Sequence, residues 1–118
     1  NYWLPFTSKG ANTLADNVAD NILAAVVHGM IPEEKDRNVK LAACSALYYG
    51  LGFVKRHFGN QAKRDHIMNV VIDCCNFSDD KVRIAAYEIL VRIAARYYEF
   101  LPDYMVRIFN VSSLHRLN

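Results

Sequence analysis

The sequence predicts an all-α protein whose antiparallel helix pairs stack into a right-handed α–α superhelix. Apolar residues recur at helical spacing along most of the 118 residues, and no stretch shows the alternation typical of a strand. In addition, the stretch 38–58 returns in altered form as 81–101, so that the segment 39–41 falls on 82–84. Both segments place a basic residue between two apolar ones, and an alanine pair follows each. The chain therefore contains two copies of a two-helix unit.

The spacing of the two copies predicts how the chain is organised. A period of roughly 40 to 47 residues is typical of HEAT and armadillo units, which bury their apolar faces only by stacking. We expect an irregular lead-in at 1–13, HEAT repeats at 14–58 and 59–101, and an incomplete further repeat at 102–118. The chain is expected to be a piece of a solenoid, and its exposed end surfaces predict that the fragment self-associates.

Helix boundaries follow from turn-forming and capping residues. The expected helices start near Leu14, Arg37, Asn60 and Lys81, and a fifth starts after Pro102. Gly29 and Pro32 end the first helix, and the acidic turn at 78–80 is suited to cap the fourth. Gly50 and Gly52 are expected to bend the second helix.

The helical period also predicts which side chains form the core. These are Leu14, Val18, Ile22, Ala25 and Val26 in the first helix, Val39, Leu41, Ala42, Ala46, Leu47, Leu51 and Val54 in the second, Ile67, Val70, Val71 and Cys74 in the third, and Val82, Ala85, Ala86, Ile89, Leu90 and Ile93 in the fourth.

Composition argues against several classes of protein. The chain is 53% hydrophobic and 22% charged, which is typical of a folded domain and not of a disordered one. Its net charge of +2 is small, and the basic segments 55–57 and 63–64 are short, so neither nucleic acid nor a membrane is an expected partner. The uncharged run 41–54 is too short to span a bilayer, which takes about 20 residues.

Residues with catalytic or metal-binding chemistry are sparse. Four histidines are scattered, and the adjacent Cys74 and Cys75 lack the spacing of zinc ligands. Cys44 stands among alanines on an expected buried face, where a thiol is inert packing. An odd number of cysteines favours reduced thiols in a cytosolic or nuclear protein. We therefore expect no enzyme activity, no metal and no cofactor.

Several short motifs, in order and at matching spacing, resemble the importin-beta (karyopherin-beta) family of nuclear transport receptors. They are NILAAVVHGM at 21–30, NVKLAA at 38–43, HIMNVV at 66–71, KVRIAA at 81–86, and the segment from Tyr97-Tyr98 to Tyr104-Met105. The resemblance runs from about Asp20 to Met105 and corresponds to the fifth and sixth HEAT repeats of that family and the start of the seventh. The two ends, 1–14 and 106–118, do not resemble it.

The resemblance implies a transport receptor that moves between cytoplasm and nucleus through the nuclear pore. In this family the first helix of each repeat lines the convex face, and the second lines the inner face that binds importin-alpha, cargo and Ran-GTP. Phe-Gly repeats of nucleoporins dock between neighbouring outer helices. Carried over by position, this site comprises Leu23, Ala24 and Val27 on one helix and Lys63, His66 and Ile67 on the other.

Two features keep other interpretations open. The family often has an acid and an aromatic residue where this chain has Lys63 and His66, which makes the expected groove more polar and more basic. From periodicity alone, Leu23, Val27 and Ile67 are interpreted as core residues. The alternative function is a HEAT scaffold outside nuclear transport, which would bind partners along the exposed edges of the second and fourth helices. The candidate residues for that role are Lys40, Lys55, Arg83 and Arg92.

Overall fold

A computed structural model describes residues 14–116 of the chain, and the side chains of 17–111. Its helices are α1 (Leu14–His28), α2 (Arg37–Gly50), α3 (Lys55–Phe58), α4 (Gln61–Cys74), α5 (Asp80–Arg96) and α6 (Met105–Arg116), with 3-10 turns at Leu51–Phe53 and Tyr98–Tyr104. No strand occurs in this part of the chain. The prediction of an all-α fold is confirmed, whereas the predicted lead-in at 1–13 lies outside the described residues.

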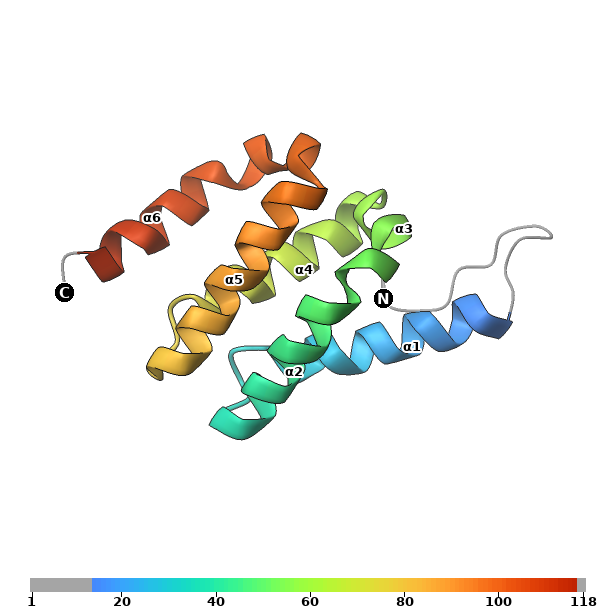
Figure 1. Ribbon diagram of the computed structural model, residues 1–118, viewed down its shortest axis with the longest axis horizontal. Helices are drawn as coiled ribbons and strands as arrows, with labels where there is room; N and C mark the ends of the chain where they lie inside the picture. Colours follow the sequence, from blue (N-terminus) through green and yellow to red (C-terminus); the bar gives the residue numbers. More distant parts are fainter. Residues whose placement is uncertain (1–13, 117–118) are drawn as a thin grey trace.

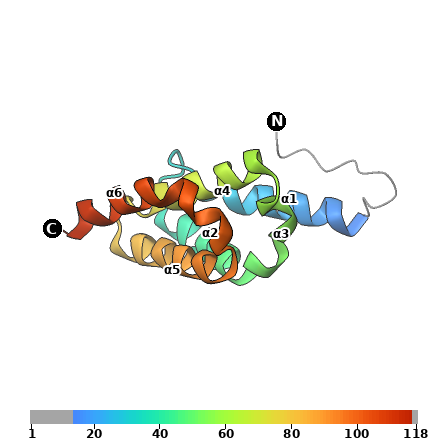
Figure 2. The same ribbon diagram turned by 90° about the horizontal axis from the view of Figure 1, so that it is seen from above.

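The helices form two layers (Figures 1 and 2). The layer of α1, α4 and α6 lies on the layer of α2 and α5, as Figure 2 shows most clearly. Helix α1 packs on α2, α4 packs on α5, and the most extensive contact joins α2 to α5. This is the arrangement of a HEAT-like solenoid, in which one helix pair stacks on the next. The boundaries predicted for the repeats remain a prediction.

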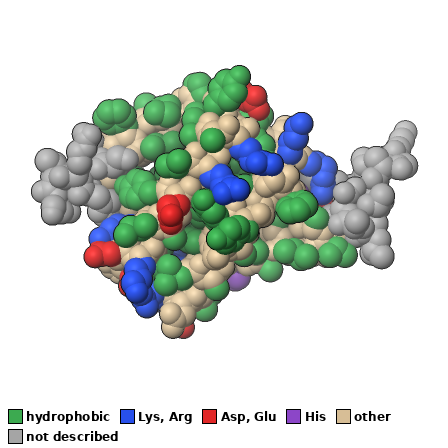
Figure 3. All heavy atoms as spheres, in the orientation of Figure 1, with side chains coloured by type: hydrophobic (Ala, Val, Ile, Leu, Met, Phe, Trp, Pro, Cys, Tyr) green, Lys and Arg blue, Asp and Glu red, His purple; other side chains and the backbone are tan. Residues whose placement is uncertain are grey.

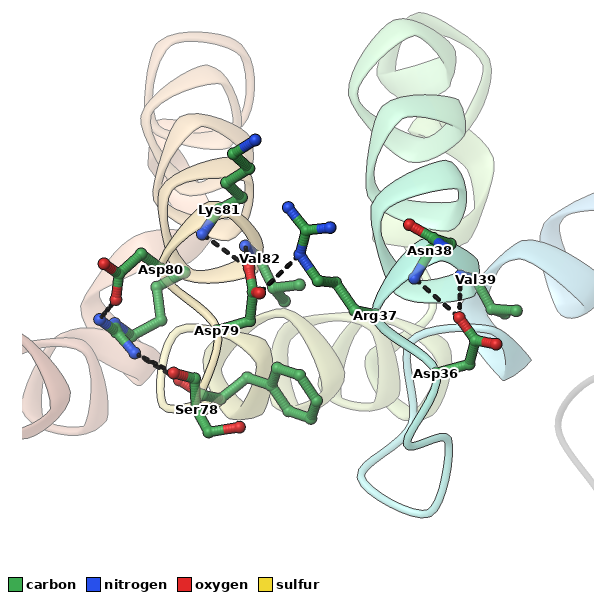
Figure 4. A network of polar contacts seen from close by, with 11 residues as sticks. Asp36, Arg37, Asn38, Val39, Ser78, Asp79, Asp80, Lys81 and Val82 are labelled. Atoms are coloured by element: carbon green, nitrogen blue, oxygen red, sulfur yellow. Dashed lines mark hydrogen bonds and ion pairs between the residues drawn. The ribbon is translucent and has the colours of Figure 1, made fainter.

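Equivalent aspartates start the second helix of each pair (Figure 4). The Asp36 carboxylate accepts from the Asn38 N–H at 2.8 Å, and the Asp79 carboxylate accepts from the Lys81 N–H at 2.8 Å. Each bond satisfies an N–H that the first helical turn cannot pair internally. The Arg37 guanidinium, one residue after the first cap, lies 2.5 Å from the Asp79 carboxylate. The second helices of the two pairs thus start alike and are joined at their starts.

The second helices of the two pairs, α2 and α5, end differently. Helix α2 ends at Gly50 and is followed by a 3-10 turn and the short α3, whereas α5 continues to Arg96. Gly50 and Gly52 occupy the positions of Ile93 and Ala95 in the second unit, so the end of α2 coincides with residues of low helix propensity. The Tyr97 hydroxyl donates to the Leu51 carbonyl at 2.6 Å, which joins the two helix ends. The predicted bend is therefore a helix end.

The predicted core is right for the second unit and partly wrong for the first. The residues predicted for α4 and α5 are buried, with Ala85 half-buried. In α1, however, Val18, Ile22 and Ala25 are exposed, and in α2 the same is true of Val39, Ala42 and Ala46. Leu14 has no described side chain.

The cause of this error is that α1 has two apolar faces and that polar residues occupy core positions. The buried face of α1 consists of Asp20, Leu23 and Val27, and Met30 is buried just after the helix, while Ile22 is exposed and lines the hollow between α1 and α2. In α2 the fully buried position next to Val39 belongs to Lys40. A search for apolar residues at helical spacing selects the wrong stripe in such a case.

Apolar residues also remain on the surface of the molecule. Figure 3 shows hydrophobic side chains interspersed with lysines and arginines on the face over α2 and α5. The largest exposed ones include Tyr49 and Phe53 on the first unit and Ile84 and Val91 on α5. The predicted self-association through such surfaces remains a prediction. None of the described helices is both long and apolar enough to cross a bilayer.

Candidate functional site

Helices α1 and α4, which the sequence predicts to form a binding groove, lie side by side and run in the same direction. Near their starts, the Asp20 carboxylate on α1 acts electrostatically on the Lys63 ammonium on α4. Near their ends, the Cys74 thiol of α4 donates to the carbonyl of Met30, two residues after α1, at 3.2 Å. The structure therefore forms the seam on which the predicted site depends, and we call it the α1–α4 seam.

Three of the six predicted site residues lie inside the core. Leu23 is 6% exposed, Val27 1% and Ile67 0%, so these side chains belong to the hydrophobic core. Ala24 and His66 are half-buried, and Lys63 is buried. The core interpretation of the apolar trio is confirmed by this burial, while their role in binding remains a prediction.

A buried polar cluster closes the start of the seam. The fully buried Asp20 carboxylate contacts His57 Nε2 at 2.6 Å and the Arg56 guanidinium at 2.7 Å. Burial lowers the pKa of His57 below its ordinary 6.5, and the hydrogen bond to Asp20 offsets only part of that effect. The imidazole is therefore neutral at pH 7 and donates from Nε2 to the carboxylate. Burial lowers the pKa of Lys63 as well, although Asp20 opposes that shift.

Sequence reasoning missed this cluster, although one signal was present. Asp20 lies three residues before Leu23 and seven before Val27, so it belongs to the same helical stripe as two core residues. An acid in that position needs a cationic or hydrogen-bonding partner when it is buried. Two residues of the basic segments 55–57 and 63–64, His57 and Lys63, are thus buried in this cluster, and Arg64 is buried separately, where it donates to the Phe58 carbonyl at 2.7 Å.

The accessible part of the seam is small and weakly polar. Burial lowers the pKa of His66, so its imidazole is neutral at neutral pH. Ala24, on the opposite helix, has only a methyl group. A neutral imidazole offers a ring and a methyl group offers an apolar contact, both without a formal charge, and each can accommodate an aromatic side chain.

The next seam along the stack, between α4 and α6, has a different chemistry. The Tyr104 hydroxyl donates to the Asp65 carboxylate and accepts from Arg64 Nε at 3.2 Å. Further along, the Arg107 guanidinium donates to the Asn69 amide oxygen and lies 3.8 Å from the Asp73 carboxylate. Polar contacts thus bridge this seam along its length.

The basic residues predicted for a scaffold role are mostly engaged inside the molecule. The prediction that Lys40 is exposed is wrong, because its side chain is 1% exposed. Arg83 donates to the carbonyls of Phe77 and Ser78 at 2.9 Å, and the Arg92 guanidinium lies 4.5 Å above the Tyr48 ring. Lys55 is exposed.

Hollows also lie between other helices, and the predicted site residue Leu23 lines the first of those described next. One of about 230 Å³ lies between α1 and α2 and is lined mainly by apolar side chains such as Ile22 and Phe53. Another of about 330 Å³ lies between α2 and α5 and is lined by residues that include Cys44, Tyr48 and Glu88. Within the described residues, no group of three or more His, Cys, Asp or Glu side chains is placed to hold a metal ion.

Together, the stacked pairs, the equivalent caps and the parallel outer helices define a HEAT-like solenoid fragment. Comparison with known proteins is more specific. The chain is 47% identical to importin subunit beta-1 of Arabidopsis thaliana over 94 residues, which is 80% of this chain and 11% of that protein. It is 43% identical over 84 residues to importin subunit beta-1 of Schizosaccharomyces pombe, covering 71% of this chain and 10% of the relative.

The same protein of Saccharomyces cerevisiae is 36% identical over 87 residues, which is 74% of this chain and 10% of that relative. No family model matches the chain. Over the matched residues the chain belongs to the importin-beta family, as the sequence resemblance implied. It spans about a tenth of the length of the curated relatives it matches.

Proposed function

We propose that this chain is part of a nuclear import receptor and that its α1–α4 seam binds Phe-Gly repeats of nucleoporins. In the longer receptor, importin-alpha, cargo and Ran-GTP bind on the inner face, and the whole moves between cytoplasm and nucleus. The proposal is supported by the similarity to importin subunit beta-1 of three organisms. The observation that carries the site itself is that two outer helices run side by side above an apolar layer.

In this proposal the phenylalanine ring lies between Ala24 and His66. Beneath them are Leu23, Val27 and Ile67, which supply a firm apolar base because they are already packed in the core. The polar cluster around Asp20 closes one end of the seam. The buried Lys63 acts as part of that end and not as a direct contact with the ring.

The energetics of one ring suit a receptor that must pass through a pore. Burying one phenylalanine side chain contributes roughly 1.5 to 3 kcal/mol, whereas a millimolar dissociation constant corresponds to about 4.1 kcal/mol. A single contact is therefore weak and short-lived. Several such contacts along one flexible repeat chain raise the effective concentration, so retention becomes collective while each contact still breaks quickly.

The test is retention of the 118-residue chain on beads that carry Phe-Gly repeats, with Ser-Gly repeats as the matched control. Wild type should bind the first beads and not the second. Ala24→Gln places a bulky amide at the seam and should reduce retention several-fold. Ala25→Gln, on the next residue of α1, changes an exposed position and should leave retention unchanged. Circular dichroism checks that both variants are folded.

Equal retention on both kinds of bead would contradict the proposal, as would a loss caused equally by the two variants. If neither kind of bead retains the folded chain, the scaffold alternative is favoured instead. That alternative would use the hollow between α2 and α5, where Tyr48 and Glu88 combine an aromatic ring with a charge.

A further inference from the structure

The hollow between α1 and α2 is an apolar surface without a cover among the described residues. Its volume is about 230 Å³, and every residue that lines it belongs to the first unit. His57 is the one lining residue with a titratable side chain. Two large side chains at the hollow, Phe53 and Ile22, are 82% and 59% exposed. A contiguous apolar surface of this kind marks a place where another part of a protein packs.

The hollow exists because α2 has small residues at two positions. Ala46 and Gly50, one turn apart, both line it. The second unit has Ile89 and Ile93 at the equivalent positions of α5, and both are buried in the core. The first unit therefore lacks side-chain volume where the second has it. An apolar cavity of about 150 Å³ can hold benzene, so the hollow has room for an aromatic ring.

The segment 1–13, which leads into α1, has the composition of a cover for this hollow. Its side chains up to residue 6 are uncharged, and most are large and apolar or aromatic, namely Tyr2, Trp3, Leu4, Pro5 and Phe6. Pro5 and Gly10 disfavour a helix in this segment. It is therefore not suited to form the inner helix of a preceding repeat, but it can supply a strap of apolar side chains.

We propose that the segment 1–13 folds back along α1 and covers the hollow between α1 and α2 with Trp3 and Phe6. Glycine permits the reversal of direction at Gly10. Pro5 favours the polyproline II conformation, in which the six steps from residue 9 back to Trp3 span roughly 19 Å. On α1 the twelve steps from Leu14 to Val26 span about 18 Å. The segment is thus long enough to reach the whole hollow.

This path brings the two aromatic residues to the two ends of the hollow. Phe6 lies three steps from residue 9, roughly 9 Å along the strap, and so comes beside Ala19, the first residue of α1 that lines the hollow. Trp3 comes beside Val26, the last one. Because the polyproline II helix has three residues per turn, Trp3 and Phe6 face the same side.

Trp3 is the one tryptophan of the chain, so its fluorescence reports directly on the cover. In the folded 118-residue chain, its emission should lie at shorter wavelength than in urea, and quenching by acrylamide should be several-fold weaker. Neither property should change when the protein is diluted, because the segment and the hollow belong to the same chain.

Two matched substitutions locate the place where Trp3 is protected. Ala46→Gln puts a polar amide into the hollow from an exposed position of α2, and it should bring emission and quenching close to the values in urea. Ala95→Gln makes the same change at an exposed position of α5 that does not line the hollow, and it should leave both unchanged. Circular dichroism checks that both variants are folded. Phe6→Ser, outside the described helices, should also increase quenching.

Trp3 emission in the folded wild type that equals the emission in urea would overturn the proposal without any variant. Protection that disappears on dilution would overturn it as well, because a second copy of the chain would then be the cover. Equal effects of Ala46→Gln and Ala95→Gln would show that Trp3 lies elsewhere. The inference does not rest on the proposed function, since the fluorescence of Trp3 is measured without a Phe-Gly peptide.

Discussion

In both helix pairs a basic side chain at the same position donates to carbonyls of the preceding loop, but the two side chains are buried to different extents. Lys40 in the first unit donates to the carbonyls of Met30 and Ile31, at 3.0 and 2.8 Å, and so ties α2 to the loop that follows α1. Arg83, its counterpart in the second unit, donates to the carbonyls of Phe77 and Ser78 in the loop that follows α4. A cation near the carbonyl end of a helix is favourable in both cases.

The two cations differ in how far the surrounding residues shield them from solvent. Lys40 is enclosed by the second unit, whose Phe77 ring lies 4.8 Å from its ammonium, and only 1% of the residue is exposed. Arg83 has a 24% exposed side chain, because the described residues place no further inner helix beside it. The contribution of a repeated contact to stability therefore depends on its position in the stack and not on the residue type.

The largest expected effect is therefore a difference between two matched substitutions. Lys40→Met leaves the Ile31 carbonyl without its donor and the buried Met30 carbonyl with only the weak Cys74 thiol donor, and should lower the free energy of unfolding by roughly 2 to 4 kcal/mol. Arg83→Met should lower it by about 1 kcal/mol or less, since water can reach the Phe77 and Ser78 carbonyls. Urea unfolding of both variants measures the difference. Equal losses of unfolding free energy in the two variants would contradict the claim that burial makes the Lys40 contacts the more stabilising ones.

A second comparison concerns two glycines of the first unit. A Cβ atom at Gly29 would lie 3.0 Å from the Ala43 Cβ and 3.4 Å from the Val26 carbonyl oxygen, so Gly29→Ala forces α1 and α2 apart. We expect a loss of about 1 to 3 kcal/mol, as for other overpacked sites. At Gly50 nothing lies within 4 Å of the added atom. Gly50→Ala should therefore raise stability by up to about 1 kcal/mol by restricting the unfolded chain.

Thermal and urea unfolding would check both glycine variants. If Gly50→Ala destabilises the chain as much as Gly29→Ala, then the end of α2 depends on the backbone freedom of glycine and not merely on helix propensity. That result would also make the difference between the ends of α2 and α5 a requirement of the fold.

A smaller expected effect is a loss of stability on acidification, which arises from His57 and His66 at the α1–α4 seam. The folded-state pKa values of His57 and His66 lie below their ordinary 6.5, so the unfolded chain binds protons first on acidification. Their contribution is fully present above about pH 6.5 and is lost as the pH falls from there toward the lower folded-state values. Asp20, Arg56 and Lys63 face His57 and set its environment. The polar contacts of Tyr104 and Arg107 across the α4–α6 seam involve no histidine.

Urea midpoints measured between about pH 7 and about pH 5.5 should thus decrease, and the decrease should be smaller in His57→Gln, which keeps a hydrogen-bond donor but does not titrate there. A midpoint that rises on acidification in this range would contradict the assigned direction of the pKa shifts. If the urea midpoint of the variant depends on pH as strongly as that of the wild type, His57 does not contribute to the pH dependence.

The sequence was sufficient for the fold class and for the second unit, because the apolar residues of α4 and α5 lie on single faces. It was insufficient for the first unit. Asp20 and Lys40 are charged residues in core positions, and no rule based on hydrophobicity places them there. Their burial depends on partners that are distant in sequence, such as His57 and the Met30 carbonyl.

The candidate site, too, could be predicted only in part from the sequence. The resemblance to importin-beta placed the proposed site between α1 and α4, because the order of helices fixes which first helices of the pairs are neighbours. The carried-over positions did not separate the buried Leu23, Val27 and Ile67, which the helical period alone assigned to the core, from the half-buried Ala24 and His66.

The central claim is that the α1–α4 seam, and not the polar α4–α6 seam, receives a phenylalanine ring. Titration of a Phe-Gly peptide into the isotope-labelled chain, followed by NMR, tests it most directly. The account predicts shifts concentrated at Ala24, Val27, His66 and Ile67, with no change at Arg107 and none with a Ser-Gly peptide. Shifts centred on Arg107, shifts centred on Tyr48 in the hollow between α2 and α5, or no shifts in a folded chain would contradict it.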